Sequence, residues 1–185
     1  LAAYAFAFIP FKGKQVMFFV FLSTMMIPWE ATIIPNYLTV RALRWTDTFQ
    51  GLTAPFLATA FGTFLLRQFF LSIPKDLHDA ATIDGAGHIR FLTTILVPLA
   101  RPALGTLAIY SFLQTYNQFL WPLLVTNDQN MRTVQIGIAI LQDEERFMWN
   151  VVMAAVVIVL LPTFILFIFG NRQLIRGLTA GAIKG

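Results

Sequence analysis

The chain has 185 residues, of which 57% are hydrophobic and only 12% are charged, and its mean hydropathy is +0.70. Soluble domains carry about 25% charged residues, so this chain has too little charge to cover a water-facing surface. The composition excludes a disordered chain, a nucleic-acid-binding domain and an ordinary cytosolic enzyme, and it indicates a membrane protein. Because the chain has no cysteine, it has no disulfide, thiolate metal site or cysteine nucleophile.

Long apolar segments define the expected membrane spans. A helix needs about 20 apolar residues to cross the hydrocarbon layer. Residues 1–11 are apolar and fit the tail of a helix that begins before residue 1, and an interrupted apolar stretch follows at 15–37. No Asp, Glu, Lys or Arg occurs in 48–66, 102–127 or 147–171. We therefore expect an all-α, polytopic transmembrane bundle, a single domain over 1–185 with spans near 1–11, 15–37, 48–71, 102–126 and 147–170.

The basic residues mark one side of the membrane, because Lys and Arg collect on the cytoplasmic side. If the loop at 12–14 is cytoplasmic, nine of the thirteen basic residues lie there: Lys12, Lys14, Arg67, Lys75, Arg90, Arg101, Arg172, Arg176 and Lys184. The outer side then holds Arg41, Arg44, Arg132 and Arg146, with six of the nine acids, Glu30, Asp47, Asp128, Asp143, Glu144 and Glu145. We expect a multi-pass inner-membrane protein with a cytoplasmic C-terminus, the loop 74–101 inside and 127–149 outside.

Prolines interrupt these segments. Each proline removes a backbone donor and clashes with the preceding turn, so it kinks or ends a helix. Two interpretations stay open for each of them: an ordinary span boundary, or a broken helix beside a moving pathway. The prolines are Pro28, Pro35, Pro55, Pro122 and Pro162.

The stretch 72–102, SIPKDLHDAATIDGAGHIRFLTTILVPLARP, predicts two short helices. Ser72 or Pro74 begins the first helix. Gly85 and Gly87 end it, because glycine adopts backbone angles that other residues avoid. A second helix is expected over 88–94, so the product is a helix-turn-helix hairpin on the cytoplasmic face. One side of the first helix is apolar, formed by Leu77, Ala80, Ala81 and Ile83. On composition alone, a plain amphipathic surface hairpin is the preferred interpretation of this stretch.

The spacing of residues in this loop matches a family motif. Asp79-Ala80-Ala81 is followed after three residues by Gly85, after nine more by Ile95 and after two more by Pro98. This pattern resembles the EAA loop of ATP-binding-cassette (ABC) importer permeases. Further segments resemble the carbohydrate-uptake branch, of maltose and glycerol-3-phosphate type: IDGA at 83–86, VPLARPAL at 97–104, FLLRQFFLSIP at 64–74, YNQFLWPLLV at 116–125 and GLTAGAIKG at 177–185.

The resemblance implies the permease subunit of an ATP-driven importer for a sugar or sugar-like solute. In such importers two permease subunits form the pathway, a dimer of ABC ATPase subunits binds beneath them, and an extracytoplasmic solute-binding protein delivers the solute. The EAA loop, here 74–98, docks on the ATPase as a coupling helix. The residues that the resemblance assigns to coupling are Asp79, Ala80, Ala81, Asp84, Gly85, Ile95 and Pro98. Position 79 is Asp where the family usually has Glu, so its carboxylate reaches one methylene less far.

Nothing in the sequence indicates catalysis. No G-x-x-x-x-G-K-[ST] phosphate loop occurs, so ATP and Mg are expected on the partner ATPase, and no cofactor or metal is expected in this chain. His78 and His88 lack the spacing of metal ligands and are expected to be solvated. The expected partners are membrane lipid and the other importer subunits, and no nucleic-acid partner is expected.

The alternative function is a secondary solute transporter of the inner membrane. Such a transporter needs an ion or proton relay, yet the three clear spans contain no acid.

Polar side chains gather in the 102–126 span. Such groups are costly in lipid unless they face protein or water. Amides offer donors and acceptors and aromatic rings stack on sugar faces, so we expect the substrate pathway among Gln114, Tyr116, Asn117, Gln118 and Trp121. Interhelical hydrogen bonding is the structural alternative. The solute stays open: the NQFLWPLL run is nearest to permeases for glycerol 3-phosphate or oligosaccharides, whereas the absence of cations from the clear spans favours a neutral sugar. Either this chain or its partner permease holds the site.

Overall fold

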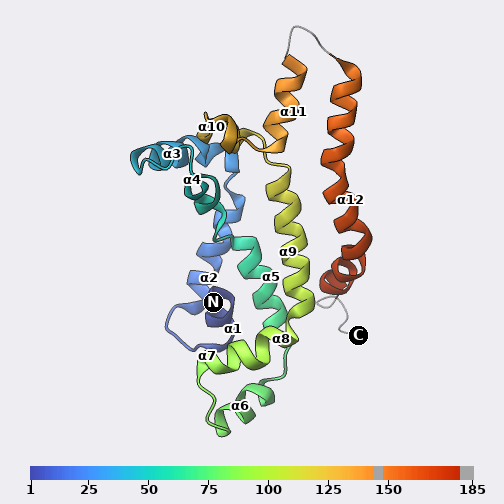
Figure 1. Cartoon of the computed structure of the whole chain (residues 1–185). Coiled ribbons are helices and arrows are strands. Elements are labelled where there is room, and N and C mark those ends of the chain that lie inside the picture. The colour runs from blue at the N-terminus through green and yellow to red at the C-terminus, as the bar shows by residue number, and fades with distance from the viewer. Residues whose placement is uncertain (144–147, 180–185) are drawn as a thin grey trace. The chain divides into compact units, whose positions relative to one another are not determined.

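The structure is a computed structural model that describes residues 1–143 and 148–179 (Figure 1). Over these ranges every regular element is a helix. The all-α prediction is therefore confirmed. Four of the charged residues that were assigned to a side of the membrane lie outside the described residues: Glu144, Glu145, Arg146 and Lys184. The last part of the tail 177–185 also lies outside them.

The contacts divide the chain into two units, of which the first comprises 1–26, 59–110 and 170–185. It contains α1 (Ala2–Phe8), α2 (Lys14–Ser23), η1 (Thr24–Met26) and α5 (Ala60–Leu71). A hairpin follows, made of α6 (Lys75–Ile83) and a second arm consisting of α7 (His88–Arg90), the π-helical segment η3 (Phe91–Leu96) and α8 (Val97–Leu99). Helix α9 (Arg101–Tyr116) begins in this unit, after a bend of 78° from the second arm.

The second unit comprises 27–58 and 111–169. Its elements are α3 (Trp29–Ala42), α4 (Phe49–Thr53), η2 (Ala54–Phe56), the end of α9, α10 (Leu120–Val125), η4 (Gln129–Met131), α11 (Val134–Asp143) and most of α12 (Trp149–Thr179). In Figure 1, α11 and α12 lie side by side and run in opposite directions.

Three of the expected spans are each divided into two helical pieces. Pro28 has an extended backbone (ψ 139°) and caps α3, which ends the preceding helix within 15–37. Within 48–71, Pro55 occupies the first turn of η2, and the break follows at 57–59, before α5. The break at 117–119 separates α9 from α10 within 102–126. By contrast, Pro35 and Pro162 lie inside α3 and α12. Pro28 and Pro55 thus lie at the starts of helical pieces, whereas Pro35 and Pro162 interrupt neither of their helices.

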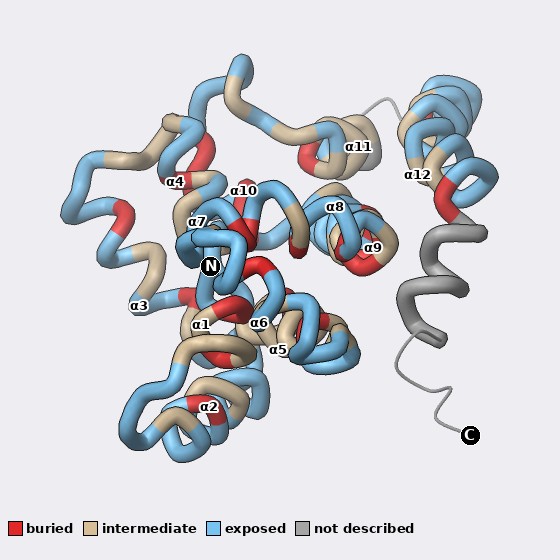
Figure 2. Tube along the Cα trace, turned by 90° about the horizontal axis from the view of Figure 1, so that it is seen from below, coloured by how far each residue is buried: buried red, intermediate tan, exposed pale blue. Residues whose placement is uncertain are grey.

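Within residues 1–143 and 148–179, one helix is by itself long and apolar enough to cross a membrane, Trp149–Gly170, with a mean hydropathy of 3.0. Three helix pairs also meet the criterion if each bent pair forms one span, which gives up to four. Figure 2 shows α12 with mostly exposed residues up to 169, and these include Phe164, Phe167 and Phe169 at 58–79% exposure. A continuous apolar surface of this kind fits contact with lipid or with another apolar subunit.

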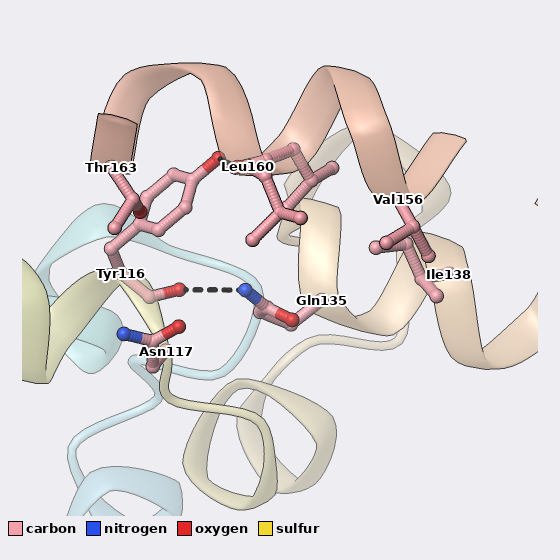
Figure 3. A pocket seen from close by; sticks show the side chains of 8 residues that line it. Tyr116, Asn117, Gln135, Ile138, Val156, Leu160 and Thr163 are labelled. Atoms are coloured by element: carbon pink, nitrogen blue, oxygen red, sulfur yellow. Dashed lines mark hydrogen bonds between the residues drawn. The ribbon is translucent and has the colours of Figure 1, made fainter. Parts of the chain in front are cut away.

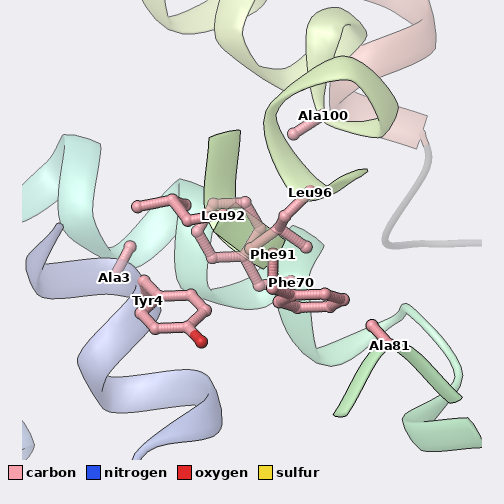
Figure 4. Packing of buried hydrophobic residues seen from close by; sticks show 8 residues of the cluster. All are labelled: Ala3, Tyr4, Phe70, Ala81, Phe91, Leu92, Leu96 and Ala100. Atoms are coloured by element: carbon pink, nitrogen blue, oxygen red, sulfur yellow. The ribbon is translucent and has the colours of Figure 1, made fainter. Parts of the chain in front are cut away.

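The core of the first unit lies where the hairpin meets α1 and α5 (Figure 4). Its buried residues are Ala3, Tyr4, Phe70, Ala81, Phe91, Leu92, Leu96 and Ala100. Two cations also tie α1 to its neighbours. Lys14 Nζ donates to the carbonyls of Ala7 and Ile9 at 3.1 Å, and Arg67 Nε donates to that of Phe6 at 3.2 Å. These carbonyls lie at the end of α1, where a helix favours positive charge.

The core of the second unit is aromatic. Trp121 is 1% exposed and packs with Ile33, Val40 and Val125. Its ring lies edge-on to those of Trp29 and Phe56, with centroids 5.7 and 6.2 Å away. Burial of rings this large supplies much of the packing energy of such a small core.

Candidate functional site

Helix α6 ends in a complete Schellman turn. The N–H of Ala86 donates to the carbonyl of Ala81 at 2.9 Å, and the N–H of Gly85 donates to that of Thr82 at 3.0 Å. Gly85 has φ +76°, the left-handed conformation that this turn needs and that glycine adopts without steric cost. The expectation that Gly85 turns the chain is confirmed. Gly87, with φ −72°, does not share this requirement.

The apolar side of α6 is buried at one position only. Ala81 is 6% exposed and packs in the core of the first unit, so it fixes α6 to the body of the unit. Ala80 is exposed, and Leu77 and Ile83 are 36% and 86% exposed. The side chain of Asp79 is 72% exposed, with its carboxylate 3.6 Å from His78 Nδ1. Small and apolar side chains next to an exposed carboxylate thus form an open face of α6, which we call the docking face (Leu77, Asp79, Ala80, Ile83 and Asp84).

Ile95 and Pro98 lie in the second arm of the hairpin. Ile95 is partly buried against the core, whereas Pro98 is exposed in the first turn of α8. Pro98 has no N–H, so the carbonyl four residues earlier, that of Thr94, loses its helical partner. The π-helical segment η3 ends two residues before this proline, and local π-helical adjustments can satisfy backbone groups that a proline leaves without a partner.

The prediction that both histidines are solvated is wrong for His78. Its ring stacks on Phe8 of α1, with centroids 5.3 Å apart and planes at 19°, and meets the ring of Phe91 edge-on at 4.9 Å. His88 is exposed, but its Nδ1 is hydrogen-bonded to the buried hydroxyl of Tyr4 at 2.8 Å. The contacts with α1 were not predictable from local sequence, because Phe8 lies 70 residues before His78 and Tyr4 lies 84 residues before His88.

A cavity of about 260 Å³ lies between α9, α11 and α12 in the second unit (Figure 3). Its lining residues are Tyr116, Asn117, Gln135, Ile138, Val156, Val159, Leu160 and Thr163. Gln135 Nε2 donates to the carbonyl of Tyr116 at 3.2 Å, and the Tyr116 hydroxyl donates to the carbonyl of Val159 at 2.8 Å. Asn117 Nδ2 donates to the carbonyl of Leu113 at 2.7 Å, which leaves its amide oxygen as an acceptor. The cavity therefore offers amide and hydroxyl groups beside apolar walls.

Only two of the five predicted pathway residues line this cavity, Tyr116 and Asn117. Gln114 is exposed and Gln118 is partly buried, both outside the lining. Trp121 lies in the aromatic core, where its Nε1 donates to the carbonyl of Gly51 at 3.1 Å. Since α9 ends at Tyr116 and α10 starts at Leu120, the spacing along one continuous helix does not apply across this break. Gln135 of α11 and Thr163 of α12 were not predicted, because each is an isolated polar residue among apolar neighbours.

Asp47 joins two loops of the second unit. Its carboxylate accepts from the backbone N–H groups of Asn127 and Asp128, the latter at 2.8 Å, and its own N–H donates to the carbonyl of Val125. Hydrogen bonds from the N–H of Asp128 and that of Asn127 hold the pKa of Asp47 below its usual value. Asp47 has φ +55°, a conformation that Asp tolerates better than most residues. Nothing in the sequence near Asp47 indicates this link.

Comparison with known proteins supports the resemblance. A family model described as "Binding-protein-dependent transport system inner membrane component" matches residues 1–179. The sn-glycerol-3-phosphate transport system permease protein UgpE of Brucella abortus (strain 2308) is 38% identical over 180 residues, and that of Rhizobium meliloti (strain 1021) is 39% identical. Each alignment covers 96% of this chain and 64% of the relative. The chain therefore spans less than two thirds of the length of these relatives.

A solved structure also matches the fold. The crystal structure of a bacterial ABC transporter involved in the import of the acidic polysaccharide alginate aligns with a TM-score of 0.82 and 25% identity, over 92% of this chain and 65% of that chain. The family match extends over almost the whole chain and includes the hairpin and the cavity. The chain is thus a member of the multi-pass inner membrane components of binding-protein-dependent transport systems.

Proposed function

We propose that this chain is the permease subunit of an ATP-driven ABC importer, forms half of its translocation pathway and couples to the ATPase through the hairpin 74–98. The observation that carries the proposal is the docking face: Asp79, Ala80 and Asp84 stay exposed on a helix that Ala81 and Gly85 hold in place. A helix whose outward side chains are small fits closely into a groove. Leu77 and Ile83 also stay exposed beside them, and a hairpin that served only as a surface cover would have no need for such open apolar side chains.

The partners follow from this role. We propose a second permease subunit, an ABC ATPase dimer beneath the hairpin and an extracytoplasmic solute-binding protein above the loops that Asp47 joins. ATP and Mg bind to the ATPase. The C-terminus lies in the cytoplasm, since the positive-inside rule favours a cytoplasmic hairpin and the two expected spans after it, 102–126 and 147–170, return the chain to that side.

We further propose that the cavity between α9, α11 and α12 is part of the solute path. Asn117 and Gln135 supply amide oxygens as acceptors for solute hydroxyl groups, and Tyr116 supplies a ring. Gln114 and Gln118 extend the polar surface of the path, whereas Trp121 supports it from the core. A hydrogen bond of this kind contributes roughly 0.5–1.5 kcal/mol, which corresponds to about two- to tenfold in affinity.

The solute class is a small polyol phosphate of the sn-glycerol 3-phosphate type, and a neutral sugar is the competing candidate. The relatives named for the glycerol 3-phosphate system favour the first. The described lining of the cavity contains no cation, which favours the second. The two observations agree if this cavity binds the hydroxyl groups of the solute and another part of the complex binds its phosphate.

The test is uptake by the full importer in proteoliposomes with its binding protein, using labelled sn-glycerol 3-phosphate and a labelled neutral disaccharide. We expect an ATPase to copurify with the chain and uptake of one solute to require ATP. Uptake that survives ATP depletion, with no copurifying ATPase, would contradict the proposal. Asn117→Leu should weaken uptake of the preferred solute at unchanged basal ATP hydrolysis, while normal uptake in that variant would exclude Asn117 from the path.

A further inference from the structure

The hairpin is joined to α1 by a set of rings that lies apart from the docking face. We call it the aromatic clasp: Tyr4 and Phe8 from α1, His78 from α6, His88 from α7 and Phe91 from η3. Tyr4 is 4% exposed and Phe91 only 1% exposed. Figure 4 shows Tyr4 and Phe91 close together, beside Phe70 of α5.

The contacts of the clasp reach both arms of the hairpin. Phe8 stacks flat on His78 of the first arm, with centroids 5.3 Å apart, and meets Phe91 of the second arm edge-on at 5.4 Å. Tyr4 adds the hydrogen bond to His88 Nδ1 at 2.8 Å. A single helix thus holds α6 and α7–η3 at the same time, so the hairpin and α1 form one mechanical body.

The clasp and the docking face occupy different sides of the hairpin. His78 turns toward α1 with its side chain 24% exposed, while its neighbour Asp79 is 72% exposed. The backbone connection from the hairpin leads through Pro98 and the bend of 78° into α9. A displacement of the docking face therefore has two physical routes into the first unit: the chain itself, toward α9, and the clasp, toward α1.

We propose that the aromatic clasp is a second coupling element, in which Tyr4 and Phe8 are positioning residues that make α1 move together with the hairpin. This inference rests on the proposed function. The directional hydrogen bond and the stacked ring pair fix the relative orientation of α1 and the hairpin, which apolar packing alone would leave free to slide. When the hairpin moves in response to ATP, α1 follows it through these rings.

The test measures ATP hydrolysed per solute imported by the full complex in proteoliposomes. Tyr4→Phe removes one hydroxyl, and Phe8→Leu removes the ring but keeps an apolar side chain. We expect the ratio to rise about fivefold in Tyr4→Phe, the factor that corresponds to a hydrogen bond of about 1 kcal/mol. Phe8→Leu should show a similar rise and Phe8→Tyr, which keeps the stacked ring, should restore the normal ratio. Basal ATP hydrolysis and the yield of assembled complex should not change.

Tyr110→Phe is the matched control, because Tyr110 lies in α9 and packs its ring on Phe61, outside the clasp. A wild-type ratio in both Tyr4→Phe and Phe8→Leu would overturn the proposal. If Phe8→Leu fails to assemble, the proposal is tested with Tyr4→Phe and with the double variant Tyr4→Phe/His88→Ala. Because Tyr4 and His88 are partners in one hydrogen bond, the ratio of ATP hydrolysed to solute imported should be no higher in the double variant than in the single variants. A wild-type complex that imports no solute with ATP overturns the proposed function, and the clasp's role falls with it.

Discussion

The indole Nε1 of Trp121 donates a hydrogen bond to the carbonyl oxygen of Gly51 at 3.1 Å, across 70 residues of chain. Gly51 is buried between this indole and the loop before α4. A Cβ at position 51 would overlap the carbonyl oxygen of Trp45 and would lie 3.2 Å from Val40 Cγ1. The close approach of these segments therefore requires glycine, for space rather than for an unusual backbone angle.

Gly51→Ala should destabilise the second unit by roughly 1–3 kcal/mol, the cost of overpacking a rigid site. The neighbour of the added methyl is backbone and cannot rotate away. Gly137→Ala is the matched control, because Gly137 lies inside α11 and a Cβ there meets no atom within 4 Å. This variant should stabilise the second unit by about 0.5–1 kcal/mol, since alanine favours the helix over glycine. Thermal unfolding of the purified complex in detergent compares the two variants. Equal melting temperatures would show that position 51 has more room than the structure gives it.

Gly85→Ala should strain the turn of the hairpin by about 1–2 kcal/mol, because φ +76° is costly for any residue with a Cβ. The added methyl meets no atom, so the effect is conformational. We expect more ATP hydrolysed per solute at an unchanged yield of complex. Gly87→Ala, whose φ is −72° and whose Cβ is equally unhindered, should behave as wild type. Identical coupling in the two variants would mean that the turn at Gly85 does not set the docking face.

The carboxylate of Asp47 should keep its two loops together down to acidic pH. Its pKa is lowered below the usual 3.8 by the N–H groups of Asp128 and Asn127. The contribution to stability is therefore complete above about pH 3.8 and disappears as the pH falls through the lower pKa of the folded state. Asp47→Asn keeps an acceptor oxygen but lacks the negative charge that strengthens the two hydrogen bonds. Hydrogen exchange at the amides of Asn127 and Asp128 should therefore be faster in this variant than in wild type at neutral pH. Glu30→Gln serves as the control. Faster exchange at the amides of Asn127 and Asp128 in that variant as well would contradict a specific link between Asp47 and this loop.

The proposed orientation predicts which positions a membrane-impermeant maleimide reaches. Because the chain has no cysteine, one introduced thiol gives its only site of modification. Asn130→Cys, exposed in η4, should be labelled in intact cells whose outer membrane is permeable. Asp79→Cys should be labelled only after the inner membrane is opened. The reverse pattern would contradict the cytoplasmic location of the hairpin.

The hairpin was predictable from sequence because its determinants are local. The turn depends on Gly85 itself, and the first helix begins directly after Pro74. The clasp and the Asp47 link were not predictable, since Tyr4 and His88 are 84 residues apart and Asp47 and Asn127 are 80 apart. A single sequence contains no signal for which distant side chains meet.

Trp121 illustrates a different limit. Its position near Asn117 placed both side chains in one expected span, where a helical repeat would relate them. The helix is interrupted at 117–119, so the helical periodicity does not continue across this break. Asn117 therefore lines the cavity, while Trp121 points into the aromatic core. The polar composition identified the right stretch of chain, but the direction of each side chain depends on where the helix ends.

Crosslinking from the docking face tests the account most directly. Ala80→Cys and, as control, Asn130→Cys are each prepared in the full importer and treated with a short thiol-to-amine reagent. We expect an adduct between the Ala80→Cys chain and the ATPase subunit, lost when the ATPase is omitted, and none from Asn130→Cys. An intact complex that transports solute but gives no ATPase adduct at position 80, or gives one equally at position 130, would contradict coupling through this hairpin.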